Sequence, residues 1–133
     1  MSIKILIQII VYLIVFLVEN LEAKIIYDFN NGKNINDWLV VDDGVMGGRS
    51  LGSFSLVKGG NSLFSGFISL ENYGGFSSIR YKKKEVEIDK YKYIVLRVFG
   101  DNKFYQLRIK SKYNDRHVYV KSFYAKNEWE EIK

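Results

Sequence analysis

The feature that most constrains the fold of this 133-residue chain is a succession of short, β-rich apolar runs separated by turn-forming clusters. The clusters NNGKN, KGGN and ENYGG lie between the runs, and their glycines and asparagines favour tight turns. The runs that predict strands cover residues 24–29, 38–41, 53–57, 62–70, 76–88, 93–100, 103–110, 117–125 and 129–133. Eight or nine short strands of this kind predict an all-β protein, built as a sandwich or a barrel.

Three of the runs support more specific predictions. In residues 103–110, Tyr105, Leu107 and Ile109 alternate with polar residues, which predicts a strand with one face toward the core. Residues 93–100 are almost continuously apolar, which predicts a central strand buried on both faces. Residues 76–88 end in lysines, which commonly protect an edge strand from further pairing.

Residues 1–23 differ in character from the rest of the chain. Lys4 precedes a run, residues 5–18, that is apolar at every position except Gln8, and a polar stretch then ends in the small residue Ala23. This order predicts a hydrophobic leader helix that acts as a secretory signal peptide, or as a membrane anchor if it is not cleaved. A buried helix is the less favoured alternative. The expected setting is therefore export to the periplasm or the exterior, or membrane anchoring, with residues 24–133 forming one domain.

Composition excludes several kinds of chemistry. The chain has no cysteine, so disulfides, thiolate metal sites and cysteine nucleophiles are excluded. Its only histidine, His117, has no second histidine to join it in a metal site, and a surface position at the start of a strand is expected. The formal charge is +5, but three acids interrupt the densest basic run, residues 80–92, so we expect a solvated strand rather than a nucleic-acid interface. No cofactor, metal ion or catalytic residue is predicted.

The stretch VDDGVMGGRS, residues 41–50, combines two adjacent acids with three glycines. A phosphate-binding loop would need a helix after it, whereas a strand-like run follows here. Asp42 and Asp43 could ligate a hard cation, but adjacent residues of a strand point to opposite faces, so an aspartate that caps a turn is favoured. Val45 and Met46 are expected to pack under the loop, into the core.

Arginines and aromatic residues supply two further predictions. Arg49 and Arg80 each follow a glycine pair, and either could form an ion pair with Asp42 or Asp43. Aromatic residues make up 16% of the chain, and exposed rings on a β-scaffold could stack on sugars. Core or cross-strand positions are the favoured interpretation for five of them: Trp38, Tyr73, Tyr105, Tyr113 and Tyr119.

Three ordered motifs resemble those of the complex I intermediate-associated protein 30 family. They are a tryptophan followed by DGVMGGRS, the block FSGFISLENYGGFSSIR, and GDNKFY, and the resemblance covers about residues 27–133. The resemblance implies a galactose-binding-domain-like jelly-roll β-sandwich and no catalytic residues. It also implies a structural role, or a place in a binding loop, for the motif positions Trp38, Asp43, Gly44, Met46, Gly47, Gly48, Ser50, Asn72, Gly74, Gly75, Phe76, Arg80, Gly100, Asp101 and Tyr105.

The resemblance also directs the functional hypotheses. Eukaryotic relatives help to assemble respiratory complex I, so the expected function is non-enzymatic protein binding in an exported or membrane-tethered setting. A carbohydrate-binding module with a glycan ligand is the alternative, and an enzyme is disfavoured. Relatives typically continue beyond NEWEEIK, so we expect the sandwich to lack its last strands and residues 24–133 alone to be prone to aggregation.

Overall fold

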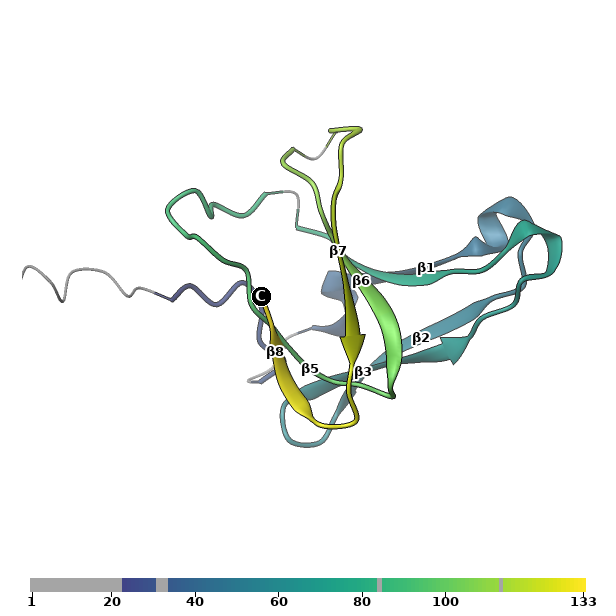
Figure 1. The fold of residues 1–133 in the computed structure, drawn as a ribbon, viewed down its shortest axis with the longest axis horizontal. Helices are drawn as coiled ribbons and strands as arrows, with labels where there is room; N and C mark the ends of the chain where they lie inside the picture. Colours follow the sequence, from purple (N-terminus) through teal and green to yellow (C-terminus); the bar gives the residue numbers. More distant parts are fainter. Residues whose placement is uncertain (1–22, 31–33, 84, 113) are drawn as a thin grey trace, which may run out of the picture.

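The all-β prediction is confirmed by the computed structural model, which describes residues 23–30, 34–83, 85–112 and 114–133 (Figure 1). The described part contains eight strands and three single-turn 3-10 helices. In chain order these are η1 (Ile35–Asp37), β1 (Trp38–Asp42), η2 (Asp43–Met46), β2 (Leu51–Val57), β3 (Asn61–Phe67), η3 (Glu71–Tyr73), β4 (Ser77–Tyr81), β5 (Leu96–Phe99), β6 (Lys103–Ile109), β7 (Tyr119–Ala125) and β8 (Trp129–Ile132).

The predicted leader helix, residues 1–23, lies outside the described residues except for its last position. In the part of the chain that is described, no helix has the length and apolar character needed to span a bilayer.

The eight strands pair two by two, in antiparallel sheets of two strands each. The pairs are β1 with β4, β2 with β3, β5 with β8, and β6 with β7. A jelly roll would place these strands in two larger sheets facing each other. The described strands form four separate pairs instead, so the jelly-roll sandwich stays a prediction.

An aromatic cluster holds the N-terminal half together. Trp38 and Tyr81 are register partners of β1 and β4, and their rings stack with centroids 5.0 Å apart. Phe54 of β2 lies 5.6 Å from Trp38, and Phe29 contacts both at 5.8 and 5.9 Å. Such ring pairs add stabilisation beyond the area they bury. The segment 24–29 was predicted as a strand; it is irregular, and it joins the fold through the rings of Tyr27 and Phe29 rather than through a ladder of backbone hydrogen bonds.

The C-terminal half is one long antiparallel ribbon with a bend in it. Phe99 pairs with Trp129 before the bend and Lys103 pairs with Ala125 after it, so the same register runs through β5–β8 and β6–β7. At the bend, the Gly100 amide donates to the Lys126 carbonyl at 2.7 Å, and the Asn102 amide donates to the Ala125 carbonyl at 2.9 Å. Figure 1 shows β5 leading into β6 and β7 leading into β8 at this bend.

Two predicted strands are shorter than expected. Residues 76–88 form a strand only over β4, which ends at Tyr81, before the lysines. Residues 93–100 form only β5, whose residues alternate between half-buried and exposed. The prediction of a central strand that is buried on both faces is therefore wrong. Within the described residues, β5 pairs with β8 alone, and its other edge is unpaired. The remaining strand predictions after residue 37 are confirmed, with ends that differ by a few residues.

The most buried side chains of the described residues are polar. Ala125 is the one buried hydrophobic residue among them, whereas Asp43, Ser50 and Ser69 are all buried. Many large apolar side chains are exposed instead, including Leu51. The fold is therefore organised around hydrogen-bonded loops and aromatic contacts, and it presents a large apolar surface.

Candidate functional site

The carboxylate of Asp43 is the centre of the glycine-rich motif. Asp43 is fully buried at the start of η2. Its Oδ1 accepts a hydrogen bond from the Ser50 amide at 2.9 Å, and its Oδ2 accepts one from the Ser50 hydroxyl at 2.5 Å. Oδ2 also accepts from the amides of Gly75 at 2.6 Å and Phe76 at 3.2 Å. One side chain therefore joins the first and second motifs, which lie about thirty residues apart in the chain.

These hydrogen bonds keep Asp43 ionised. The Ser50 hydroxyl bond is the largest influence, and with the backbone amides it lowers the pKa of Asp43 from 3.8 to about 2, although burial opposes the shift. Donors directed at a carboxylate favour its charged form. A buried carboxylate that is ionised near neutral pH and accepts four hydrogen bonds is suited to holding together the loops that donate to it.

Ser50 and Ser69 extend the buried network to the end of β3. The Ser50 Oγ, which donates to Asp43, accepts a hydrogen bond from the Ser69 amide at 3.0 Å. The Ser69 Oγ accepts in turn from the amide of Glu71, the first residue of η3, at 3.2 Å. The three buried side chains therefore tie η2, the start of β2 and η3 into one ordered corner.

Two glycines of the motifs are required by close approach to this corner. A Cβ atom at Gly48 would lie 2.3 Å from the Asp43 Cγ. A Cβ atom at Gly74 would lie 2.6 Å from the Asp43 Oδ2 and 2.9 Å from the Ser69 carbonyl oxygen. No side chain fits at these distances, so both glycines let the backbone close around the carboxylate. Asn72 closes the outer side, since its side-chain amide donates to the Gly47 carbonyl at 3.1 Å.

The prediction that Val45 and Met46 pack into the core is wrong. Their exposed fractions are 80% and 63%. The reason is that η2 turns inward through the Asp43 carboxylate, so the following residues of this single turn, Gly44 included, face solvent.

The predicted ion pairs of Arg49 and Arg80 with the aspartates are also wrong. Arg49 pairs with Glu71 at 2.7 Å, and both side chains are about two-thirds exposed. Arg80 is exposed on β4 and forms no ion pair among the described residues. Both aspartates accept hydrogen bonds from backbone amides instead. The Asp42 Oδ2 accepts from the Gly52 amide at 3.0 Å, but its side chain does not cap η2, and Asp43 joins distant segments rather than capping a local turn.

The third motif forms a separate corner, at the bend of the C-terminal ribbon. The Tyr105 hydroxyl donates to the Asp101 Oδ1 at 2.8 Å, and the Lys103 ammonium pairs with the other oxygen of Asp101. Burial, followed by the Asp101 bond, raises the pKa of Tyr105 to about 12. A Cβ atom at Gly100 would lie 2.3 Å from both the Cβ and the carbonyl oxygen of Ala125, so the bend requires a glycine there. No hydrogen bond among the described residues connects this corner with Asp43.

The aromatic residues divide between the two interpretations. Trp38 and Tyr105 are half-buried, and Tyr105 stacks on its register partner Phe123 at 6.2 Å, as expected for core or cross-strand positions. That interpretation is wrong for Tyr73, which is 99% exposed because it belongs to the surface turn η3 with a positive φ of 61°. Tyr119 pairs with Ile109 across β6 and β7, which confirms a cross-strand position, although its side chain is 68% exposed. Tyr113 lies outside the described residues.

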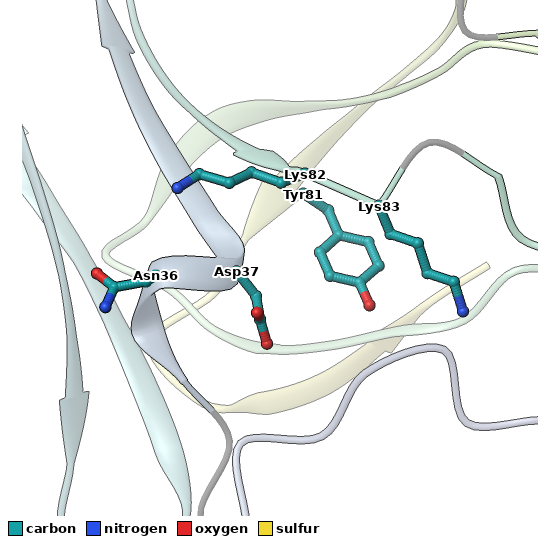
Figure 2. Close-up of a pocket in the computed structure, with 5 residues that line it drawn as sticks. All are labelled: Asn36, Asp37, Tyr81, Lys82 and Lys83. Atoms are coloured by element: carbon teal, nitrogen blue, oxygen red, sulfur yellow. The ribbon is translucent and has the colours of Figure 1, made fainter.

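The structure contains a groove that sequence reasoning missed. It lies between η1 and the end of β4, has a volume of about 320 Å³, and is lined by Asn36, Asp37, Tyr81, Lys82 and Lys83 (Figure 2). The Tyr27 hydroxyl donates to the Asp37 Oδ2 at 2.9 Å, and the Lys82 amide donates to the Asp37 carbonyl at 2.9 Å. Burial, and then the bond to Asp37, raises the pKa of Tyr27. Asp37 is thus engaged in holding the groove together.

The remaining titratable residues of the described part offer no metal centre. No group of three or more His, Asp or Glu side chains is close enough to hold a metal ion within those ranges. The surface position predicted for His117 is confirmed: its side chain is 94% exposed, and its Nδ1 lies 3.2 Å from the Oδ1 of nearby Asp115.

Fold and site together define a class: an all-β protein whose motif residues close two hydrogen-bonded corners, one around the carboxylate of Asp43 and one around that of Asp101. The sequence profile of the complex I intermediate-associated protein 30 family matches residues 27–133, and the chain belongs to that family. The match includes all three motifs and extends over both halves of the described fold. No curated protein and no solved structure gives a significant match.

Proposed function

We propose that this protein is a non-enzymatic binding protein of the assembly-factor type, which acts by holding a protein partner. The family match over residues 27–133 is the observation that carries the proposal. The family name refers to intermediates of respiratory complex I, and we extend that type of partner to this chain. In the same proposal the strands belong to a jelly-roll sandwich of galactose-binding-domain type.

The exposed face of the β2–β3 hairpin supports a binding role. Neither strand contains a charged residue. Phe54 and Phe64 alternate inward, while the register partners Leu51 and Phe67 point outward and are 71% and 66% exposed. An uncharged surface with large apolar side chains is typical of the centre of a protein interface.

We place this activity in an exported or membrane-tethered setting. The basis is the hydrophobic run 5–18 after Lys4, which has the order expected of a signal peptide or of an anchor. Fractionation of cells that express a C-terminally tagged full chain tests this part of the proposal. Recovery of the tag in the cytosol alone would contradict it.

The binding role is tested by cross-linking and capture of the tagged full chain in its native host. We expect subunits of respiratory complex I among the captured proteins, and several-fold less of them with the double variant Leu51→Ser/Phe67→Ser. Tyr73→Ser, which removes an almost fully exposed side chain outside the hairpin, is the matched control and should capture as the wild type does. Equal capture by all three proteins, or capture without complex I subunits, would contradict the proposal.

A carbohydrate-binding module is the second candidate, and exposed aromatic residues favour it. Phe104 and Tyr124 are cross-strand partners with ring centroids 5.2 Å apart, and Phe99 and Trp129 form a similar pair at 5.7 Å. All four rings are at least two-fifths exposed. A glycan array separates the two candidates: specific glycan binding that Trp129→Ala abolishes would favour the module over the assembly role.

A further inference from the structure

A second groove lies in the C-terminal half and takes no part in the corners described above. Its volume is about 390 Å³. Its apolar wall consists of Ile88, Ile94, Leu107, Ile109 and Ile132. These side chains come from β6, from β8 and from the irregular segment before β5, so segments far apart in the sequence meet in the groove.

The alternation of the ribbon explains why this surface is apolar. Leu107 and Ile109 lie on the half-buried face of β6, and Gln106 and Arg108 lie on its exposed face. Leu107 is the register partner of Lys121 in β7, and cross-strand partners project from the same face of a sheet. Lys121 therefore stands on the apolar face of the ribbon, beside the wall of the groove.

Among the residues that the structure describes, lysines supply the only charged side chains that line the groove. Lys92, Lys121 and Lys133 line it together with the apolar wall, and no acidic side chain lines it among the described residues. Lysine can lay its aliphatic stem along an apolar surface while its ammonium group stays in water. An aliphatic wall flanked by ammonium groups is complementary to a ligand that has an apolar body and a negatively charged end.

We propose that this groove binds an anionic amphiphile, that is, an aliphatic chain that ends in a carboxylate. The aliphatic chain would lie against the isoleucine and leucine side chains, and the carboxylate would meet the ammonium groups of Lys92 and Lys121. The volume falls within the range of roughly 300–1,000 Å³ that is typical of small-molecule sites. The site does not depend on the proposed assembly function.

Isoleucine methyl groups report on the groove directly. In the experiment, the isoleucine δ-methyl groups of the full chain are labelled with ¹³C, and dodecanoate is added at concentrations below those at which it forms micelles. The chemical shifts of the methyl groups are recorded at each step of the titration. We expect saturable shifts at Ile88, Ile94, Ile109 and Ile132, and none at Ile35 and Ile79, which lie in η1 and β4. Dodecyltrimethylammonium has a similar aliphatic chain and the opposite charge. Its affinity should be lower than that of dodecanoate by about tenfold or more.

Charge reversal completes the test. Lys92→Glu/Lys121→Glu should weaken dodecanoate binding by about tenfold, since it replaces two attractions with two repulsions. Lys58→Glu/Lys83→Glu changes the net charge equally at two exposed positions outside the groove, and it should bind as the wild type does. Three results would overturn the proposal: no shift at the four groove isoleucines, equal binding of the cationic amphiphile, or equal weakening by both double variants.

Discussion

Replacing Gly74 by alanine tests whether close approach to the Asp43 carboxylate is the reason for a glycine at this position of the motif corner. The backbone of Gly74 has φ −70° and ψ −167°, which alanine adopts without strain, so only the added methyl group acts. That methyl group would lie 2.6 Å from the Asp43 Oδ2 and about 3 Å from two backbone carbonyl oxygens, those of Ser69 and Glu71. Backbone oxygens held by the corner cannot move aside as a flexible side chain can.

The expected cost follows from this crowding. Overpacking a well-packed site typically lowers the free energy of unfolding by about 1–3 kcal/mol. Here the methyl group also displaces the Asp43 carboxylate, which accepts four hydrogen bonds. We therefore expect Gly74→Ala to lower the free energy of unfolding by about 3 kcal/mol. For a domain of about 100 residues each kcal/mol shifts Tm by roughly 4–8 °C. Thermal unfolding followed by circular dichroism should therefore show a Tm lower by more than about 10 °C.

Gly44→Ala is the matched control, because it adds the same methyl group to the same corner. A Cβ atom at Gly44 has no neighbour within 4 Å, and its φ is not positive. The reduced entropy of the unfolded chain should make this variant neutral or more stable by up to about 1 kcal/mol. Similar melting of Gly74→Ala and wild type, or an equal loss in both variants, would refute the steric explanation.

Three more predictions concern the two corners. Because the pKa of Asp43 is lower in the folded state, its contribution to stability is complete above pH 4 and is lost as the pH falls through about 2. Urea unfolding at several acidic pH values should show this loss of stability. The variant Asp43→Asn should not show this pH dependence. Gly100→Ala should destabilise the ribbon bend by about 1–3 kcal/mol, and Ala125→Gly should not restore it, since the Ala125 carbonyl oxygen is as close as its Cβ; chemical denaturation of both variants would decide. Arg49→Ala should change the free energy of unfolding by less than about 1 kcal/mol because its pair with Glu71 is exposed, and a larger loss on urea unfolding would contradict this.

The corner also explains why the motif residues are spaced as they are. Ser50 follows Asp43 by seven residues, which is enough chain for η2 and the glycine turn to bring its amide and hydroxyl back to the carboxylate. Gly75 and Phe76 approach the same carboxylate from the other motif, at the entry to β4. A motif of this kind determines loop architecture.

Local patterns in the sequence were enough to predict the elements. Short β-rich runs between turn-forming clusters located β1, β2, β3, β6, β7 and β8, and period-two alternation further identified the half-buried face of β6. The same reasoning failed for residues 93–100, since a continuous apolar run does not say whether another strand lies on each side. Family membership also followed from the sequence, because three motifs in a fixed order are specific.

What only the tertiary structure decided is which groups meet. Arg49 and Asp43 are six residues apart, yet Arg49 pairs with Glu71, while backbone amides of Gly75 and Phe76 reach the Asp43 carboxylate. Backbone donors carry no sequence signal, so a buried aspartate that they satisfy looks the same in the sequence as one that needs an arginine. The groove behind Lys92 and Lys121 is likewise invisible in the sequence, because it forms only where the bent ribbon and the segment before β5 come together.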